Sequence, residues 1–408
     1  MKILVINTGS SSIKYELFDV EDRKILAGGL AEKIGEESSI LTHRIVLPNG
    51  ESEKNVDESM IADHREGLNR IVGLLVDPKH GVVADKADIS AVGHRVVHGG
   101  EAFHSTVIID EDVIAAIKEN IPLAPLHNPS NLMGIEVAGS IFPDAPQVAV
   151  FDTAFHQTIP MMAFLYAIPY EMYERHKVRR YGFHGTSHAY VSEQVAEYLG
   201  CSLTELNLIT IHIGNGASMA AIKNGKSVDT TMGMTPLAGL VMGTRSGDLD
   251  PALPFFMGDH LGMSLQEIDW LLNKESGLKG LCGTNDMREV IDRMEKGDKR
   301  AAVALDIYTY RIRKYIGAYF AVLGGVDAII FTAGVGEHAP LIREKSCQGL
   351  NGLGIEIDTK KNVASSGSIR EINTQNSEVK VLVIPTNEEL MIARETKKAI
   401  DCPDRTAQ

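Results

Sequence analysis

The chain opens with two short apolar runs separated by a polar turn. Residues 3–6 are apolar, residues 7–12 are rich in Gly and Ser, and residues 13–18 alternate between polar and apolar side chains. This order is typical of a β-hairpin with a Gly- and Ser-rich tip. The pattern places Lys14 on the second strand, close to that tip.

The same pattern returns near the middle of the chain. Residues 208–213 have the pattern of a strand, residues 214–218 are small, and residues 219–222 form a return strand. The Asn-Gly pair at 224–225 then favours another hairpin turn. We interpret the two hairpins as an internal duplication of one supersecondary unit, and chance recurrence of a short motif is the alternative.

Strands and helices alternate over the rest of the chain. Amphipathic patterns predict helices at residues 187–199, 300–323 and 388–400, and glycines end the first two. Further strands are predicted at residues 89–97, 148–151, 326–332 and 379–384. Together with the hairpins, these elements predict an α/β protein of two related domains, which agrees with a length of 408 residues.

Composition and charge exclude several classes of protein. The chain has 54 acidic and 40 basic residues and a formal net charge of −14, so it lacks the basic face of a nucleic-acid-binding protein. Its four cysteines form no Cys-x-x-Cys pair, which argues against a disulfide framework, a zinc site and a redox site. No apolar run has the length of a signal-peptide core or a membrane span. We therefore expect a cytoplasmic protein with neither a nucleic acid nor a membrane as partner.

The two hairpin tips have the composition of phosphate-binding turns. Glycine lets the backbone approach a phosphate, and neighbouring N–H groups and hydroxyls can donate to its oxygens. Lys14 would add a positive charge at the first tip. The alternative is a plain hairpin whose serines cap their own turn. A further turn, Gly334-Val335-Gly336 after a predicted strand, indicates a close backbone approach to a nucleotide.

Two arginines and one histidine stand in unusual surroundings. Arg95 lies in a β-branched run that should be buried, and a buried Arg needs an anionic partner, either a structural carboxylate or a bound anion. Arg245 lies in a loop of small residues, where a salt bridge to Asp248 is the alternative to anion binding. His184 lies just before a predicted helix N-terminus, which favours anions. His188 is interpreted as a cap of that helix.

The remaining acids and histidines divide into functional and structural candidates. Asp152 follows a predicted strand, where acids and metal ligands are found in open α/β sheets. Glu389 fits a capping box with Thr386, which leaves Glu388 as the better candidate for holding Mg²⁺ together with substrate phosphates. His127 is a loop candidate. The sequence predicts core positions for the histidines at 94 and 98, and surface positions for those at 43, 64, 80, 104, 176 and 260.

Six segments stand in the order and spacing of the acetate kinase family. They are residues 7–14, 94–101, 151–156, 181–188, 233–251 and 331–337. The chain resembles this family over essentially its whole length. The resemblance implies the actin, sugar-kinase and Hsp70-like ATPase superfold, in which two duplicated ribonuclease-H-like α/β domains close on a nucleotide. It further implies an N-terminal domain of residues 1–152 with 386–408, and a C-terminal domain of residues 153–385 that carries the interface of a homodimer.

The resemblance also implies a role for each matching residue. The catalytic residues would be Asp152, Arg95, Arg245 and His184, with His184, Arg245 and His127 stabilising the transition state. Asn7 and Glu388 would hold Mg²⁺, for which Mn²⁺ is a substitute. The substrate acid would contact Arg95, Val97, Leu126, Phe183 and Pro236. ATP or ADP would be bound by Ser10, Ser12, Lys14, His212, Asn215, Gly216, Asp286, Met287, Arg288, Gly334 and Val335.

The implied reaction is the reversible, direct transfer of the ATP γ-phosphoryl group to acetate, giving acetyl phosphate and ADP. A carboxylate is already a nucleophile at neutral pH, so this chemistry needs cations rather than a general base. A propionate kinase of the same family is the closest alternative, although Val97 should narrow the pocket in favour of acetate. An ATP-driven clamp of the actin or Hsp70 type is the alternative from another class.

Overall fold

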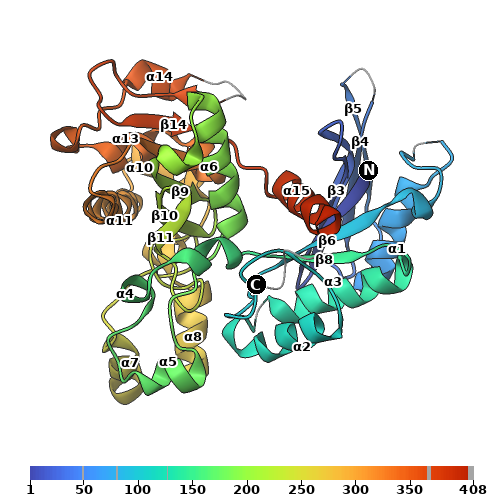
Figure 1. Cartoon of the computed structure of the whole chain (residues 1–408). Helices are drawn as coiled ribbons and strands as arrows, with labels where there is room; N and C mark the ends of the chain where they lie inside the picture. Colours follow the sequence, from blue (N-terminus) through green and yellow to red (C-terminus); the bar gives the residue numbers. More distant parts are fainter. Residues whose placement is uncertain (48–49, 80, 126, 365–368, 403–408) are drawn as a thin grey trace. The chain divides into compact units, whose positions relative to one another are not determined.

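The computed structural model describes residues 1–47, 50–79, 81–125, 127–364 and 369–402, and the chain divides into two compact units (Figure 1). Unit 1 comprises Met1–Ala154 together with Asn387–Gln408, and unit 2 comprises Phe155–Thr386. The last helix of the chain therefore belongs to the same unit as the first hairpin. Each unit is built around one sheet, and the candidate site residues lie mainly at strand ends and turns.

Unit 1 contains one eight-stranded sheet. Its strands are β1 (Lys2–Gly9), β2 (Ser12–Asp19), β3 (Lys24–Glu32), β4 (Ile40–Val46), β5 (Ser52–Asp57), β6 (Ala91–Val96), β7 (Val107–Ile108) and β8 (Gln147–Phe151). They are ordered β5-β4-β3-β2-β1-β6-β8-β7. Strands β1 to β5 are antiparallel to one another, whereas β6 is parallel to β1 and β8 is parallel to β6. The helices are α1 (His64–Leu75), α2 (Glu111–Glu119), α3 (Asn128–Ile141) and α15 (Glu388–Asp401), with 3₁₀ turns η1 (Lys86–Asp88) and η2 (Ile121–Leu123).

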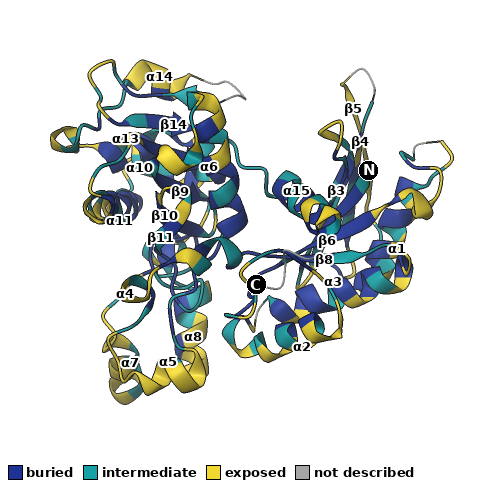
Figure 2. Ribbon diagram, in the orientation of Figure 1, coloured by how far each residue is buried: buried dark blue, intermediate teal, exposed yellow. Residues whose placement is uncertain are grey.

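Different helices cover the two faces of this sheet. Because side chains alternate along a strand, β1 sends Leu4 and Ile6 into the core that includes α1 and α3. Its other side chains, Ile3 and Val5, pack against α15 in a second core. All four are at most 1% exposed, and the buried strands are visible in Figure 2. Because both faces of β1 are buried, its side chains at residues 3–6 are all apolar.

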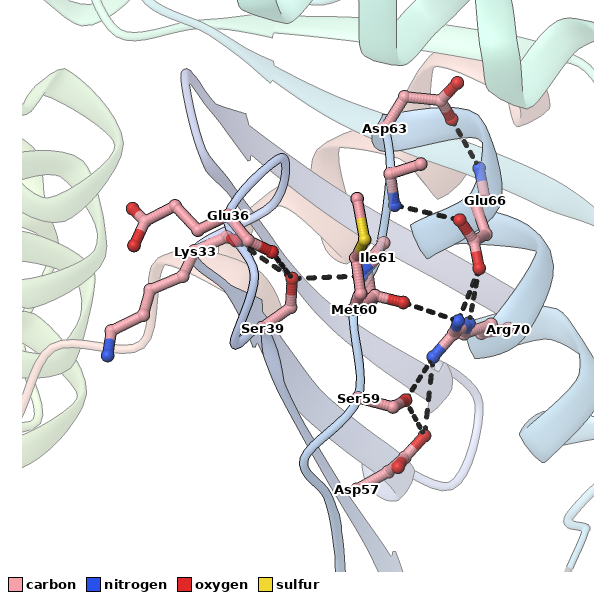
Figure 3. A network of polar contacts seen from close by, with 11 residues as sticks. Lys33, Glu36, Ser39, Asp57, Ser59, Met60, Ile61, Asp63, Glu66 and Arg70 are labelled. Atoms are coloured by element: carbon pink, nitrogen blue, oxygen red, sulfur yellow. Dashed lines mark hydrogen bonds and ion pairs between the residues drawn. The ribbon is translucent and has the colours of Figure 1, made fainter.

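A polar network ties α1 to the segment that follows β5 (Figure 3). Arg70 of α1 donates from Nη1 to the Ser59 hydroxyl (2.6 Å) and from Nη2 to the Met60 carbonyl oxygen (2.7 Å). It also forms an ion pair with Glu66, one turn earlier in the helix. Asp63 caps the helix by accepting a hydrogen bond from the Glu66 backbone N–H (2.8 Å). The network fixes the first turn of α1, which contacts the tip of the first hairpin.

Unit 2 contains one six-stranded sheet, in the order β11-β10-β9-β12-β14-β13. Its strands are β9 (Asn207–Ile213), β10 (Ala217–Lys223), β11 (Lys226–Thr230), β12 (Ala328–Thr332), β13 (Arg370–Glu371) and β14 (Lys380–Val383). Its helices are α4 (Met161–Phe164), α5 (Glu171–His176), α6 (Gly185–Leu199), α7 (Leu253–Leu261), α8 (Leu265–Lys274), α9 (Gly277–Cys282), α10 (Met287–Glu295), α11 (Lys299–Leu323), α12 (Ala333–His338), α13 (Pro340–Cys347) and α14 (Thr359–Val363). The 3₁₀ turns η4 (Leu203–Glu205) and η5 (Asn351–Leu353) also lie here, and η3 (Ala154–Thr158) spans the boundary. Within the described ranges, no helix combines the length and the apolar character needed to cross a bilayer.

The two sheets share a five-strand core. In unit 1 this core has the order β3-β2-β1-β6-β8, and in unit 2 it has the order β11-β10-β9-β12-β14. In both, the first three strands are antiparallel and the last two run parallel to the central hairpin strand. The predicted α/β class and the predicted duplication are therefore confirmed. Each hairpin tip lies at the carboxyl end of its central strand, which is the edge where ligands bind in such sheets.

Candidate functional site

Two helices of unit 1 hold the tip of the first hairpin from behind. The Nε2 atom of His64, in α1, lies 2.8 Å from the Gly9 carbonyl oxygen. The Asn131 side-chain amide, in α3, donates to the Thr8 carbonyl oxygen (3.0 Å). His64 is only 7% exposed, so its predicted surface position is wrong. Its ring satisfies a carbonyl group of the turn, and this contact requires burial against the hairpin.

The predicted phosphate-binding residues of this hairpin lie close together. Ser12 pairs with Gly9 across the turn, and Lys14 lies opposite Asn7 in the strand register. Ser10 is exposed at the tip. The Lys14 side chain is half-exposed, and its ammonium group forms an ion pair with Glu389 of α15. The hairpin therefore presents hydroxyls and one cation whose charge is already partly balanced.

The predicted capping box at the start of α15 is wrong. The cap is Asn387, whose side chain accepts a hydrogen bond from the Leu390 backbone N–H (2.9 Å). The Thr386 hydroxyl instead bonds the Ser187 hydroxyl (2.8 Å). Because Glu389 is not needed for capping, its carboxylate can pair with Lys14.

Arg95 and Asp152 form a bidentate pair at the carboxyl ends of β6 and β8. Arg95 donates from Nε to Asp152 Oδ1 (3.1 Å) and from Nη2 to Oδ2 (2.5 Å). The Asp152 side chain is 1% exposed and that of Arg95 is 21% exposed. Burial opposes the charge of Arg95, but the nearby carboxylates of Asp152 and Glu388 outweigh it, so the pKa of Arg95 is raised. The anionic partner that the sequence required for Arg95 is therefore the carboxylate of Asp152.

Glu388 has the properties expected of a cation ligand. Its Oε1 atom is buried and has no hydrogen-bond partner among the described residues. Burial raises the pKa of Glu388, the positive charges of Arg95 and Lys14 oppose that effect, and Glu389 adds to it. No cluster of three or more His, Cys, Asp or Glu that could hold a metal occurs in the described ranges. This sparse donor set fits Mg²⁺, which binds through one or two carboxylates and keeps water and phosphate oxygens as its other ligands.

Two apolar residues of unit 1, Val97 and Leu126, were predicted to contact the substrate acid, and the structure describes only Val97. Val97 is 5% exposed, and its backbone N–H donates to Asn131 Oδ1 (3.0 Å). Leu126 lies outside the described residues. His127 stands at the N-cap position of α3 and is partly exposed. His94 and His98 are buried, which confirms their predicted core positions.

Residues from three elements of unit 2 converge on the tip of the second hairpin. A Cβ atom placed on Gly216 would lie 3.4 Å from Cε1 and Nε2 of His184, and 3.8 Å from Nη1 of Arg245. The Asn215 carbonyl oxygen accepts a hydrogen bond from the Gly243 N–H (3.0 Å), which joins this tip to the Arg245 loop. The Asn285 side chain donates to Asn215 Oδ1 (3.1 Å). An imidazole edge and a guanidinium group thus face one glycine turn.

His184 is held in an unusual backbone conformation by its partners. It is the N-cap residue of α6 with φ at 56°, which is uncommon for a residue with a Cβ. Its ring stacks on that of His212, with centroids 4.1 Å apart, and its Nδ1 lies 2.9 Å from Ser218 Oγ. Phe183, just before it, is 2% exposed. His188 was predicted to cap the helix, and this prediction is wrong. Its side chain is buried, and both of its ring nitrogens are hydrogen-bonded.

Arg245 does not form the predicted alternative salt bridge with Asp248. Its Nη1 lies 3.4 Å from the Pro236 carbonyl oxygen, and none of the described carboxylates forms an ion pair with it. Asp248 instead accepts hydrogen bonds from the Gly239 N–H (2.7 Å) and the Tyr315 hydroxyl (2.5 Å). Burial lowers the pKa of Arg245. A partly buried guanidinium without a carboxylate partner among the described residues is suited to binding an anion.

Five of the predicted nucleotide-binding residues lie at two helix starts in unit 2. Asp286 caps α10 and forms an ion pair with the largely exposed Arg288 (2.6 Å), and the hydrogen bonds from Arg288 lower the pKa of Asp286 to about 2. Met287 is buried behind this pair. The other two, Gly334 and Val335, lie in the short helix α12, directly after β12.

The sequence interpretation placed His43 wrongly and missed a contact of Ser218 with the site. His43, predicted at the surface, is 4% exposed and bonds the Tyr15 hydroxyl (2.5 Å). Ser218 was noted only as a small turn residue, although its hydroxyl bonds His184. For Ser218, the available signal was its place directly after the Gly-rich turn of the second hairpin.

Comparisons with known proteins cover almost the whole chain. The family model described as the acetokinase family matches residues 2–394. An acetate kinase of Thermotoga petrophila is 58% identical over 404 residues, which cover 98% of this chain and 99% of that protein. Among solved structures, an acetate kinase of Porphyromonas gingivalis is 48% identical with a TM-score of 0.91, covering 98% of this chain and 99% of that one. A propionate kinase of Francisella tularensis is 45% identical with a TM-score of 0.91, covering 97% and 99%. The chain belongs to the acetokinase family.

Proposed function

We propose that the chain is an acetate kinase, which transfers the γ-phosphoryl group of ATP directly to acetate in a reversible reaction. The observation that carries the proposal is the approach of His184 and Arg245 to Gly216, at the tip of the second hairpin. Both groups can donate hydrogen bonds to the oxygens of a phosphoryl group. Membership of the acetokinase family and the 58% identity to an acetate kinase support the choice of substrate.

The reaction requires that two anions meet. The acetate carboxylate attacks the γ-phosphorus, ADP leaves, and charge spreads over the three equatorial oxygens of a metaphosphate-like transition state. Unit 2 contributes Arg245 and His184 to hold those oxygens, and unit 1 contributes Arg95 to hold the substrate anion, with His127 as an additional donor. Asp152 accepts two hydrogen bonds from Arg95, and a carboxylate nucleophile needs no general base, so we assign Asp152 the role of orienting that guanidinium.

Residues of both units would bind the nucleotide. Ser10, Ser12 and Lys14 offer donors at the first hairpin, and His212, Asn215 and Gly216 line the second. The adenosine portion would contact Asp286, Met287, Arg288, Gly334 and Val335. Glu388 and Asn7 would hold Mg²⁺, or Mn²⁺ in its place. When bound, the metal ion supplies positive charge to the β- and γ-phosphates.

The acetate methyl group would lie against Val97, Leu126, Phe183 and Pro236. One methylene group changes the transition-state free energy by only about 1–3 kcal/mol, so propionate should react as a weaker substrate. A propionate kinase with the same fold and 45% identity makes this the main alternative.

A coupled assay of ADP formation with acetate, propionate and butyrate tests the proposal. We expect kcat/KM to fall in that order. A higher kcat/KM for propionate than for acetate would assign the chain as a propionate kinase instead. ATP hydrolysis that no carboxylic acid stimulates would favour a clamp of the actin or Hsp70 type.

Unit 2 carries an apolar face that suits a homodimer. No residue of α7 is buried, and α7 and α8 together expose Leu253, Phe255, Phe256, Leu261, Leu265 and Trp270 by 39–79%. With about 150–250 Å² for a large side chain, these six expose roughly 700 Å². That approaches the ~800 Å² that each partner buries in a standard interface, and it exceeds the ~300–600 Å² patch of a typical monomer.

We therefore propose that a second copy of the chain covers α7 and α8. Sedimentation should give a dimer for the wild type and a monomer for the Phe255→Glu/Leu265→Glu variant. A monomeric wild type at micromolar concentration would contradict this assembly. A cytoplasmic location is also proposed, because ATP is the co-substrate and all four cysteines are free thiols.

A further inference from the structure

A chain of hydrogen bonds runs from His184 into the core of unit 2. The Nδ1 atom of His184 lies 2.9 Å from Ser218 Oγ, and the same oxygen lies 2.8 Å from His188 Nε2. On the far side of its ring, His188 Nδ1 lies 2.7 Å from Thr210 Oγ1. Ser218, His188 and Thr210 are all 0% exposed. Water therefore cannot complete the bonding of these three groups, and the protons must be shared among them.

The proton count allows two arrangements when both rings are neutral. A serine hydroxyl has one proton, so Ser218 can donate to only one of the two imidazoles. Accepting from both rings would leave its own buried proton without an acceptor, so Ser218 donates to one ring and accepts from the other. In the first arrangement, Thr210 donates to His188 Nδ1, His188 Nε2–H donates to Ser218, and Ser218 donates to His184 Nδ1. In the second arrangement the three hydrogen bonds are reversed. His184 Nδ1–H donates to Ser218, Ser218 donates to His188 Nε2, and His188 Nδ1–H donates to Thr210.

The Thr210 hydroxyl distinguishes the two arrangements. In the first, its proton is bonded to His188 Nδ1. In the second, Thr210 is an acceptor, and none of the described residues provides another acceptor for its proton. A buried donor without an acceptor is costly, so the first arrangement is favoured. Neutral His188 is consistent with its surroundings, because burial, together with the nearby rings of His156 and His212, holds its pKa well below the usual value.

We propose that Thr210, His188 and Ser218 fix the tautomer of His184, so that His184 carries its proton on Nε2. That nitrogen lies on the ring edge that faces Gly216. The three residues are positioning residues that act through His184. The importance of this tautomer for catalysis rests on the proposed function, whereas the tautomer itself follows from the hydrogen-bond chain alone.

The fixed tautomer has a chemical purpose at this site. A neutral imidazole with Nε2–H is a hydrogen-bond donor toward a phosphoryl oxygen, whereas the other tautomer would present a lone pair to it. The donor is already oriented before the reaction, so no proton has to move as charge develops on the oxygens. A neutral ring also adds no second positive charge beside Arg245.

Nuclear magnetic resonance of ¹⁵N-histidine-labelled protein tests the tautomer directly, without an activity measurement. Long-range ¹H–¹⁵N correlations distinguish protonated from unprotonated ring nitrogens, and the His184→Ala and His188→Gln variants assign the two rings. We expect protonated Nε2 and unprotonated Nδ1 for both rings at pH 7.5, without nucleotide. A proton on Nδ1 of His184, or an imidazolium ion there, would overturn the proposal even if the protein is an active acetate kinase.

Removing the Thr210 hydroxyl, at the far end of the hydrogen-bond series, tests the coupling to His184. Thr210→Val deletes one hydroxyl at nearly constant volume, and it should give His184 mixed tautomer signals and reduce kcat about tenfold with KM for ATP unchanged. Thr210→Ser keeps the hydroxyl and should restore both properties. Thr309→Val is the matched control. Thr309 is a buried threonine in α11 that donates a hydrogen bond to the Leu305 carbonyl oxygen and has no part in the hydrogen-bond series of His184.

The double variant His184→Ala/Thr210→Val separates positioning from general destabilisation. If Thr210 acts through His184, the second substitution should lower kcat no further in the His184→Ala background. A full additional tenfold loss there, or an unchanged His184 tautomer in Thr210→Val, would show that Thr210 has only a structural role. If no acid is phosphorylated at all, the proposed function fails while the tautomer result still stands.

Discussion

The substitution Asp152→Asn tests whether Asp152 orients Arg95 or takes part in the chemistry itself. Asn has the same shape and keeps one acceptor oxygen, but it loses the charge and the second acceptor of the bidentate pair. Breaking a buried ion pair typically costs about 3–5 kcal/mol, because one charge is left uncompensated. Arg95 is 21% exposed and the Glu388 charge remains nearby, so we expect a loss of about 2 kcal/mol in unfolding free energy.

The kinetic effect should be larger than the effect on stability. A guanidinium that is free to rotate no longer holds the substrate anion in line, and loss of one such oriented donor typically lowers kcat by about 10²-fold. Urea unfolding and the coupled ADP assay measure the two effects separately. If Asp152 acts only through Arg95, Asp152→Asn should add almost nothing to the loss caused by Arg95→Ala.

The double variant Arg95→Ala/Asp152→Asn therefore decides between the two roles. If the two losses in kcat multiply, Asp152 contributes independently of Arg95, and the orienting role is refuted. A fall in the kcat of the wild type at acidic pH that is absent from Asp152→Asn would point to proton transfer by Asp152. Glu371→Gln is a matched control, because it removes the carboxylate of an ion pair with Lys380 on the edge strand β13.

Three further predictions concern charge and loop position. Burial and the charge of Glu389 raise the pKa of Glu16 to about 7, so its stabilising contribution is present below pH 4.5 and lost as the pH rises through 7. Glu16→Gln should therefore raise the unfolding free energy by about 1–3 kcal/mol at pH 8 in urea titrations, and this gain should largely disappear at pH 5. Glu388→Gln should increase the Mg²⁺ concentration for half-maximal activity at least tenfold, and an unchanged metal requirement would remove Glu388 from the metal site. Tyr315→Phe loosens the loop that carries Arg245 and should lower kcat several-fold with KM for ATP unchanged, whereas equal losses in kcat and thermal stability would indicate a general structural effect.

The parts of the fold that could be predicted are those determined by neighbours in the chain. The first two strands were expected at residues 3–6 and 13–18, and they span Lys2–Gly9 and Ser12–Asp19. The long helix expected at residues 300–323 is Lys299–Leu323. Apolar periodicity and Gly-rich turns determine these elements locally, so a single sequence contains the signal.

The contacts that hold the site are determined by residues far apart in the chain. His64 bonds a carbonyl group 55 residues earlier, and Asp248 bonds a hydroxyl 67 residues later. Local patterns assign such residues to the surface or to the nearest opposite charge, which is why the surface position predicted for His64 is wrong and why an Arg245–Asp248 salt bridge stood as an alternative. Glu389 shows the same limit, because a local capping pattern was available and the true partner, Lys14, lies at the other end of the chain.

The candidate anion-binding cations are balanced differently in the two units of this chain, whose net charge is −14. In unit 1, Arg95 and Lys14 each have a carboxylate partner, so their charges are already stabilised without a ligand. In unit 2, Arg245 is partly buried, burial lowers its pKa, and no described carboxylate pairs with it. Desolvation of Arg245 is therefore offset only when an anion binds. It follows that the affinity for phosphate should depend most on Arg245, whereas the paired cations of unit 1 should mainly orient the groups that react.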